Sequence, residues 1–361
     1  MKSILFFHPK NDYTGSTRVL ADVIARDYAG QSVDIIVNRN HGKGFLSELP
    51  NVQLIGYCVP TWHGKRIPVV APLVWRIHFV LLTLCLGWRY NTFYINTITP
   101  YLAALLGRLY GKKVIYHIHE KFVQQTLSVR IMEWIFAHTK AHRIFVSRYT
   151  RDSYPDNPSC TSTVCYNHLG KQFLDRVDIK PIGERKRNTV LMIASLSKVK
   201  GLSTFMAVAE LLPDLHFRLM LSADMESIQA YLEQSIPKNV ELIPAQSNIH
   251  PYLREADLML NLSNPFLCVE TFGMTILEAM AYGVPSIAPN IGGPIELIED
   301  GYNGFCVDVT DAKVVAEKIK EVLGLDNYER FADNALASNS GFLCLPPNPL
   351  FAGEYHSMLT G

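Results

Sequence analysis

Two carboxylates eight positions apart, Glu270 and Glu278, enclose the segment of this chain whose residue types best suit chemistry. Before them, the apolar run at 257–262 has the character of a buried parallel strand. After them, the residues that follow Gly273 continue as an apolar stretch typical of a helix. This order predicts a loop that carries Glu270 and ends in exposed N–H groups at a helix start, which favours an anion.

The second carboxylate lies about one turn into the predicted helix, where it can accept hydrogen bonds from a pair of hydroxyls. One acid near a reacting centre, N–H groups for a phosphate and one acid for a ribose together indicate a nucleotide-sugar pocket. The residues that follow strengthen this interpretation. Residues 285–288 have the character of a further strand, and Gly292-Gly293 opens a second helix with Pro294 in its first turn.

The run from Ser263 to Asp308 closely resembles the donor-binding half of the family 4 retaining glycosyltransferases, which have the GT-B fold. The resemblance rests on Glu, Phe-Gly and Glu at this spacing, followed by Glu-Ala-Met-Ala, Gly-Val-Pro and Gly-Gly with a Glu three residues later. It implies retention of configuration. Glu270 would then position the sugar, stabilise an oxocarbenium-like centre or act as the nucleophile. The resemblance assigns donor binding in this segment to Phe272, Gly273, Met274, Thr275 and Glu278.

A second donor-binding loop follows the predicted strand 189–194. The family has Gly-Arg and then Lys-Gly here, and both bases bind the diphosphate. Lys200-Gly201 matches, whereas Ser195 occupies the position of the arginine and supplies a hydroxyl without a charge. The resemblance therefore implies a diphosphate site at Ser195 and Lys200 that is weaker or rearranged.

In the first half of the chain, His119 and Glu120 follow the predicted strand 114–118. The family carries a His followed by an acid here, near the transferred sugar, and we assign the catalytic role to His119. Strand alternation places His117 on the same face, and we interpret it as a structural histidine. Near the N-terminus, Gly15 and Ser16 join the first strand to a helix and match an acceptor and phosphate loop, although a plain helix cap explains them as well.

No metal is expected, because bases and a helix start serve the leaving phosphate and no Asp-x-Asp motif lies in these loops. His117 and His119 have no third ligand at a recognisable spacing for zinc. No cofactor is expected either, since the nucleotide-sugar is a substrate. Seven scattered cysteines indicate thiols in a reducing compartment.

The 361 residues carry a net charge of +1, so no global field points to nucleic acid. Between Leu49 and His119, however, there are seven bases, three of the four tryptophans and no acid. This window contains the apolar stretch 74–86. This pattern fits a core helix with snorkelling bases, and it equally allows the basic, Trp-rich region 62–89 to contact an anionic membrane surface; the sequence leaves both interpretations open.

Strands and helices alternate along both halves, which predicts an α/β chain with two Rossmann-like, doubly wound parallel sheets and a cleft between them, the GT-B fold. The predicted domains are 1–170 for the acceptor, a linker at 171–187, and 188–349 for the donor. The segment 341–347 is predicted to be a loop, and a last helix at about 350–361 to pack back onto the first domain.

These features predict a cytoplasmic, metal-independent, retaining glycosyltransferase, peripheral on the inner face of the membrane. It would transfer a sugar from a UDP- or GDP-sugar to a glycan or lipid-linked acceptor in cell-surface polysaccharide synthesis. The alternatives are a catalytically silent GT-B scaffold, favoured by Ser195, and a related GT-B epimerase or phosphorylase.

Overall fold

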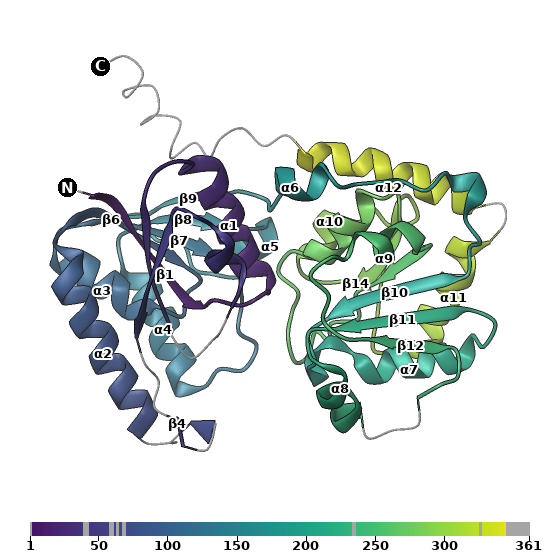
Figure 1. Ribbon diagram of the computed structural model, residues 1–361, viewed down its shortest axis with the longest axis horizontal. Helices are drawn as coiled ribbons and strands as arrows, with labels where there is room; N and C mark the ends of the chain where they lie inside the picture. Colours follow the sequence, from purple (N-terminus) through teal and green to yellow (C-terminus); the bar gives the residue numbers. More distant parts are fainter. Residues whose placement is uncertain are drawn as a thin grey trace, which may run out of the picture. The chain divides into compact units, whose positions relative to one another are not determined.

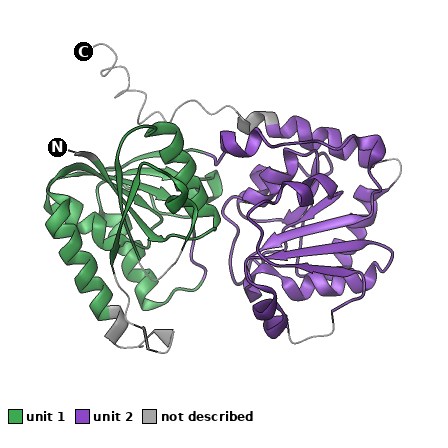
Figure 2. Cartoon of the chain, in the orientation of Figure 1, with its two compact units in different colours: residues 1–120, 124–165, 346–361 green, residues 121–123, 166–345 purple. Residues whose placement is uncertain are grey.

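The computed structural model describes residues 2–38, 43–57, 61–62, 65–66, 70–232, 236–324 and 327–343. Within these residues the chain forms two compact units (Figure 2). Unit 1 lies within residues 1–120 and 124–165, and unit 2 within residues 121–123 and 166–345. The helix predicted at 350–361 lies outside the described residues, as do His63, Gly64 and the side chain of Trp62 in the basic region.

Unit 1 is built on a seven-stranded parallel sheet with the strand order β3-β2-β1-β6-β7-β8-β9. Apolar runs with β-branched and aromatic residues form these strands, as predicted. Their bounds are β1 Lys2–Lys10, β2 Val33–Asn38, β3 Val52–Tyr57, β6 Tyr90–Asn96, β7 Lys113–Ile118, β8 His142–Phe145 and β9 Thr161–Val164.

Helices cover both faces of this sheet, with α1 on one side and α2, α3 and α4 on the other (Figure 1). Successive β1 residues alternate between the faces: Phe6 packs with the α1 core, whereas the Phe7 ring lies 5.9 Å from that of Phe79 in α2. The described helices are α1 Gly15–Asp27, α2 Val70–Gly87, α3 Tyr101–Leu109, α4 Leu127–His138, α5 Arg148–Asp152 and the 3-10 turn η1 Phe45–Glu48. A short antiparallel pair, β4 Thr61–Trp62 and β5 Lys65–Arg66, precedes α2.

Unit 2 contains a six-stranded parallel sheet with the order β12-β11-β10-β13-β14-β15. Strand order reverses direction beside β10, which is the position where parallel α/β sheets bind ligands at their carboxyl ends. The bounds are β10 Thr189–Ala194, β11 His216–Leu221, β12 Val240–Ile243, β13 Leu258–Leu260, β14 Ser286–Pro289 and β15 Gly304–Val307.

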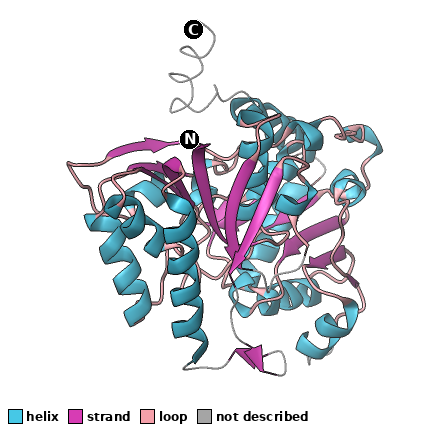
Figure 3. Cartoon of the chain, turned by 60° about the vertical axis from the view of Figure 1, so that its left-hand side comes forward, coloured by secondary structure: helices cyan, strands magenta, loops and turns pink. Residues whose placement is uncertain are grey.

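Helices flank this sheet too: α9, α10 and α12 lie above it in Figure 1, and α7 and α8 below it. Figure 3 shows both sheets enclosed by helices in a second view. The helices are α6 Lys171–Leu174, α7 Leu202–Leu211, α8 Met225–Leu232, α9 His250–Glu255, α10 Met274–Met280, α11 Ala312–Leu323 and α12 Tyr328–Leu343, with 3-10 turns η2 Ile182–Glu184, η3 Lys198–Lys200 and η4 Gly293–Glu296. The loop predicted at 341–347 is wrong in its first part, because α12 continues through residues 341–343.

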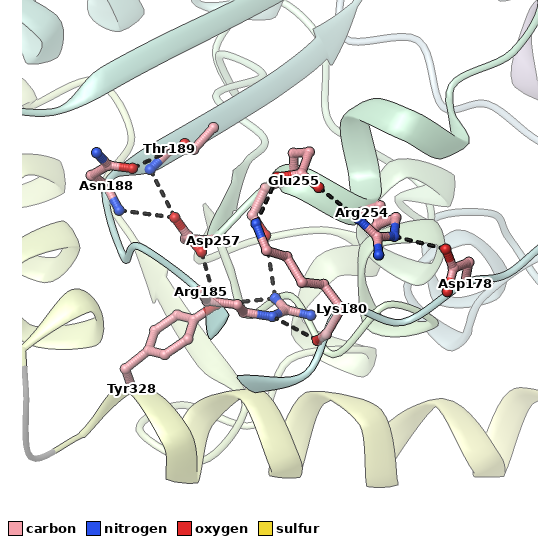
Figure 4. Close-up of polar contacts among 10 residues, drawn as sticks. Asp178, Lys180, Arg185, Asn188, Thr189, Arg254, Glu255, Asp257 and Tyr328 are labelled. Atoms are coloured by element: carbon pink, nitrogen blue, oxygen red, sulfur yellow. Dashed lines mark hydrogen bonds and ion pairs between the residues drawn. The ribbon is translucent and has the colours of Figure 1, made fainter. Parts of the chain in front are cut away.

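The polar stretch 171–187 is fixed to unit 2 by Arg185, whose buried guanidinium donates to the backbone oxygens of Ala256 and Gly283. It also donates to the Tyr328 hydroxyl (Figure 4). Beside it, Asp257 Oδ2 accepts from the backbone N–H groups of Asn188 and Thr189 at 2.8 and 3.0 Å. The chain therefore enters β10 along a hydrogen-bonded path.

Candidate functional site

Lys200 and Glu270 meet at the carboxyl end of the unit 2 sheet. Lys200 Nζ lies 2.8 Å from Glu270 Oε2 and 3.1 Å from Ser263 Oγ. The Ser263 hydroxyl also donates to Glu270 Oε2 at 3.3 Å, and Asn261 Nδ2 lies 3.5 Å from the same oxygen. The structure thus brings together two residues that the sequence assigned separately to diphosphate binding and to the reacting centre.

Mutual electrostatics keep both partners of this pair charged. Burial alone would raise the pKa of Glu270, but the Lys200 charge and the hydrogen bonds to the carboxylate hold that pKa below its usual value. The Glu270 charge in turn raises the pKa of Lys200 against the opposing effect of burial. The site therefore presents an ionised carboxylate and an ammonium at neutral pH.

A close backbone approach fixes Lys200. Gly201 has a φ of 70°, and a Cβ at this position would lie 2.0 Å from the Leu262 backbone oxygen. The Asn264 N–H donates to the Val199 oxygen at 2.8 Å. The turn η3 is therefore joined directly to the loop that leaves β13, and Lys200 can reach Ser263 without a long linker.

The Gly292-Gly293 pair fixes the position of Glu270 by a close backbone approach, as Gly201 does for Lys200. Gly293 N–H donates to the Glu270 backbone oxygen at 2.8 Å. A Cβ on Gly292 would lie 2.3 Å from that oxygen, and one on Gly293 would lie 2.3 Å from the Thr271 oxygen. The second glycine loop thus holds the Glu270 loop by backbone contact, which only glycines permit.

The other residues that the sequence assigned to donor binding in this segment lie at the start of α10. Gly273 has a φ of 106° and is the N-cap residue, and the buried Phe272 ring lies 6.2 Å from that of Tyr166. Met274 and Thr275 are half-buried in the first turn. Glu278 in α10 is buried, with 4% of its surface exposed. Ser195 is half-buried directly after β10.

In unit 1, His119 lies just beyond the carboxyl end of β7, as predicted. Its Nε2 is 2.9 Å from Asn96 Oδ1, and its ring centroid is 4.2 Å from that of His117. Burial, together with the nearby His117 and His8, holds the pKa of His119 well below its usual value. His117 is buried, and its Nδ1 lies 2.9 Å from the Tyr94 hydroxyl, which agrees with a structural role.

Glu120 follows His119 and accepts a hydrogen bond from the Ile98 N–H at 2.8 Å through Oε1. Burial raises the pKa of this carboxyl to about 7, although its hydrogen bonds oppose the shift. A carboxyl group that exchanges its proton near neutral pH is suited to acid–base chemistry.

The loop before α1 is organised by a residue that the sequence did not single out. Asp12 Oδ1 accepts from the Thr14 hydroxyl at 2.6 Å and from the Thr17 hydroxyl at 2.7 Å. Gly15 begins α1, and the Ser16 backbone oxygen accepts from Asn96 Nδ2 at 3.1 Å. Thr14 is the N-cap residue but its side chain makes no capping bond, so the helix-cap explanation accounts for less of this loop than Asp12 does.

Two further polar residues, His8 and Asn96, lie beside His119, and the sequence did not single them out. Asn96 Nδ2 lies 2.9 Å from His8 Nδ1, and both side chains are buried beside His119. A signal existed in the sequence, because each residue ends an apolar run, and polar residues at the carboxyl ends of parallel strands point to a site. Among the described residues, no group of three or more His, Cys, Asp or Glu side chains is arranged to hold a metal ion.

Comparison with known proteins finds a sequence-family match over most of unit 2. Residues 176–337 match the model for glycosyl transferases group 1. The N-acetyl-alpha-D-glucosaminyl L-malate synthase of Bacillus anthracis is 30% identical over 175 residues, which cover 46% of this chain and 45% of that protein. The chain spans about half or less of the length of the first curated relatives that it matches.

Solved structures match the whole chain. HepE of Anabaena in complex with UDP-glucose has a TM-score of 0.79 at 19% identity, and the match covers 99% of this chain and 100% of that one. WaaG, a glycosyltransferase involved in lipopolysaccharide biosynthesis, has a TM-score of 0.70 at 15% identity, with 99% and 100% covered. The predicted GT-B fold is therefore confirmed, and the match of residues 176–337 supports a glycosyltransferase family for this chain.

Proposed function

We propose that this protein is a retaining glycosyltransferase that moves a sugar from a nucleotide diphosphate sugar to a glycan or lipid-linked acceptor in cell-surface polysaccharide synthesis. The observation that carries the proposal is the contact of Lys200, Ser263 and Glu270 at the carboxyl end of the unit 2 sheet. It lies within the family match, and it combines a cation for phosphate with an ionised carboxylate for a sugar.

Departure of the nucleoside diphosphate develops negative charge on the β-phosphate, and a preorganised cation lowers the energy of that state. Lys200 supplies the cation, and Ser195 and the N–H groups near Gly273 and Thr275 add hydrogen bonds. This set needs no metal. The absence of a second positive charge at Ser195 makes the reaction depend strongly on Lys200.

Glu270 is ionised and accepts hydrogen bonds from Lys200 and Ser263 on the same oxygen. Such bonds reduce the nucleophilicity of a carboxylate and leave it well suited to accept hydroxyl hydrogens or to face a positive centre. We therefore propose that Glu270 positions the sugar and stabilises an oxocarbenium-like centre, rather than forming a covalent intermediate.

Unit 1 is proposed to bind the acceptor, with His119 as its catalytic residue and the loop at Gly15 and Ser16 beside it. HepE was crystallised with UDP and UDP-glucose, which supports a UDP-sugar as the first donor to test and a GDP-sugar as the second.

The apolar exposure of α2 supports the proposed contact with an anionic membrane on the cytoplasmic side. Leu73, Ile77, Leu81 and Trp88 follow each other at helical spacing and are 51–62% exposed, whereas Phe79 on the opposite side is buried. Arg89 lies over the Trp88 ring, 5.4 Å from its centroid, as in a residue pair at a lipid interface. None of the described helices is long and apolar enough to cross a bilayer.

This exposed surface continues on α3, which packs against α2, and on α4, which packs against α3. Leu105, Ile131 and Trp134 are 42–62% exposed and border an apolar cavity of about 380 Å³ that also touches Arg130. Apolar side chains edged by an arginine match the acyl region and the phosphates of a lipid layer. The proposed membrane surface therefore extends beyond region 62–89.

A paired binding and turnover experiment tests the proposed function. The melting temperature is measured with UDP, GDP, ADP and their sugar conjugates for the wild type, Lys200→Ala and the exposed control Lys313→Ala. A ligand that binds only the folded state raises the melting temperature, because it stabilises that state by about 2.7 kcal/mol when its concentration is a hundredfold above Kd. We expect a shift with one nucleotide that is lost only in Lys200→Ala.

Turnover of the same donor is followed with lipid-linked and free glycan acceptors. Transfer with retained anomeric configuration supports the proposal. Binding without transfer to any acceptor favours the silent scaffold that Ser195 suggests, and the absence of any nucleotide-induced shift in the wild type contradicts donor binding.

A further inference from the structure

A chain of buried polar side chains runs through unit 1 from Asp12 to His119. Thr17 Oγ1 lies 2.7 Å from Asp12 Oδ1 and 3.0 Å from His8 Nε2. Asn96 then bridges the two histidines, with Nδ2 at 2.9 Å from His8 Nδ1 and Oδ1 at 2.9 Å from His119 Nε2. The chain joins the loop before α1 to the carboxyl ends of β1, β6 and β7.

The charge state of Asp12 sets the direction of the hydrogen bonds at the first end of this chain. The Thr14 and Thr17 hydroxyls hold the pKa of the Asp12 carboxyl below its usual value despite its partial burial, so Asp12 is ionised and accepts only. The Thr17 hydroxyl therefore donates to Asp12, and its oxygen accepts from His8 Nε2–H. Burial lowers the pKa of His8 to about 4, so His8 is neutral and its Nδ1 carries a lone pair.

A contact with the backbone independently fixes the orientation of the Asn96 amide. Asn96 Nδ2 lies 3.1 Å from the Ser16 carbonyl oxygen, which is an acceptor only. The amide nitrogen of Asn96 must therefore face Ser16 and His8, and its carbonyl oxygen must face His119. A carbonyl oxygen accepts, so His119 Nε2 must carry the hydrogen.

Asn96 is itself held by an unusual turn. The next residue, Thr97, has a φ of 72°, a left-handed conformation that is strained for a β-branched residue. Thr97 N–H donates to the His117 oxygen at 2.8 Å, and the Asn96 side chain is fully buried. The strained residue therefore directly follows Asn96, the last residue of β6, whose side chain contacts His119.

We propose that Asn96, oriented by His8 and the Ser16 carbonyl, is a positioning residue that holds His119 as the neutral Nε2–H tautomer, which makes Nδ1 its acceptor nitrogen. The tautomer follows from unit 1 alone, and only its catalytic consequence rests on the proposed function. A neutral histidine that accepts at Nδ1 is suited to receive the hydrogen of a sugar hydroxyl and unsuited to act as a cation toward phosphate.

Nuclear magnetic resonance on the full chain tests the tautomer without any activity. The protein is labelled with ¹⁵N-histidine, and long-range ¹H–¹⁵N correlations are recorded at pH 7, with the His119 signals identified by their loss in His119→Gln. We expect the pattern of an Nε2–H imidazole. An Nδ1–H pattern or an imidazolium pattern for His119 in the wild type would overturn the proposal, whatever the variants do.

Asn96→Asp tests the role of the amide. A carboxylate at this position accepts from both histidines and favours a charged His119, whose other titratable neighbours are His117, Glu120 and His8. We expect the His119 signals to titrate at a higher pH than in the wild type. The matched control is Asn91→Asp, at an exposed position of the same strand, which should leave them unchanged.

Kinetics separate positioning from a general loss of structure. Asn96→Asp should lower kcat by up to about 10²-fold, because a misoriented group can cost that much, while KM for the donor and its nucleotide-induced melting shift stay near wild type. An unchanged His119 titration in Asn96→Asp would show that Asn96 does not control the histidine. If nucleotides do not shift the melting temperature of the wild type, the proposed donor site is contradicted. The tautomer of His119, measured by nuclear magnetic resonance, is unaffected by that result.

Discussion

Lys200 Nζ and Glu270 Oε2 are 2.8 Å apart although 70 positions separate the two residues in the chain. In the proposed donor site of unit 2, the charge of Lys200 is thus balanced by that of Glu270. A diphosphate that binds Lys200 must compete with Glu270 for the ammonium, and this competition leads to the first prediction.

Glu270→Gln should abolish transfer while leaving nucleotide diphosphate binding as tight as in the wild type or tighter, because Lys200 loses its carboxylate partner. Isothermal titration calorimetry measures binding, and donor turnover measures transfer. Glu241→Gln, which alters an acid of β12 that pairs with Arg218, is the control and should change neither. Weaker nucleotide binding in Glu270→Gln would show that the carboxylate contributes to the donor affinity instead of opposing it.

The same pair makes the stability of unit 2 depend on pH. The folded state lowers the pKa of Glu270 from its ordinary 4.5, so the contribution of this group is present above that value and is lost as the pH falls through the folded pKa. Chemical denaturation between pH 7 and pH 3 should therefore show a steeper loss of stability for the wild type than for Glu270→Gln. Equal slopes for the two proteins would mean that the pair adds no net stability.

Gly292→Ala should destabilise unit 2 and weaken donor binding, because the new Cβ would lie 2.3 Å from the Glu270 backbone oxygen at a φ of 97°. We expect a cost of about 1–3 kcal/mol from steric strain at this backbone conformation. Gly183→Ala is the matched control, since nothing lies within 4 Å of a Cβ at that position. Thermal denaturation compares the two, and a stable Gly292→Ala protein would contradict the backbone contact.

Arg185→Ala should cost about 3 kcal/mol or more of unfolding free energy, because it leaves the carbonyl oxygens of Ala256, Gly283 and Tyr282 without their donor. The neighbouring exposed Lys186→Ala serves as the control and should lie within about 0.5 kcal/mol of the wild type. Urea denaturation measures both variants. A cost for Arg185→Ala as small as that of the control would contradict these contacts of the guanidinium.

Membrane binding should depend on the exposed stripe of α2. The double variant Ile77→Glu and Leu81→Glu places two acids among its apolar residues and should reduce binding to vesicles of anionic lipid by at least about tenfold. Leu211→Glu, at an exposed position of α7 in unit 2, is the control. Vesicle sedimentation at low and high salt gives the result, and equal binding of the two variants would exclude α2 as the contact.

Much of the fold was predictable because the strands are continuous apolar runs between turn residues. Strand β10 has the predicted bounds, Thr189–Ala194. Helix α11 was missed, although its buried Val315, Ile319 and Val322 follow helical spacing and its Asp311 cap accepts from Lys313 N–H. The acidic appearance of residues 308–311 concealed a helix start.

The candidate site was predictable as residue types at strand ends, but not as partners. The sequence placed Lys200 and Glu270 at one edge of a sheet, whereas their ion pair depends on the backbone contacts of Gly201 and Gly292. His8 and Asn96 were missed because no motif names them. Their role follows only from the adjacency of β1 and β6 in the sheet, which the chain order does not reveal.

The contact between Gly292 and Glu270 also bears on how this site can be re-engineered. The loop after β14 contacts the backbone of the loop after β13 and so determines its conformation. The location of the Glu270 carboxylate therefore depends on residues that follow a neighbouring strand. If residues 263–273 alone were exchanged with those of a relative, the new loop would have to pack against residues 292–293, which fit the original loop. A chimaera designed to accept a different sugar should therefore transfer residues 263–273 and 290–296 as one module.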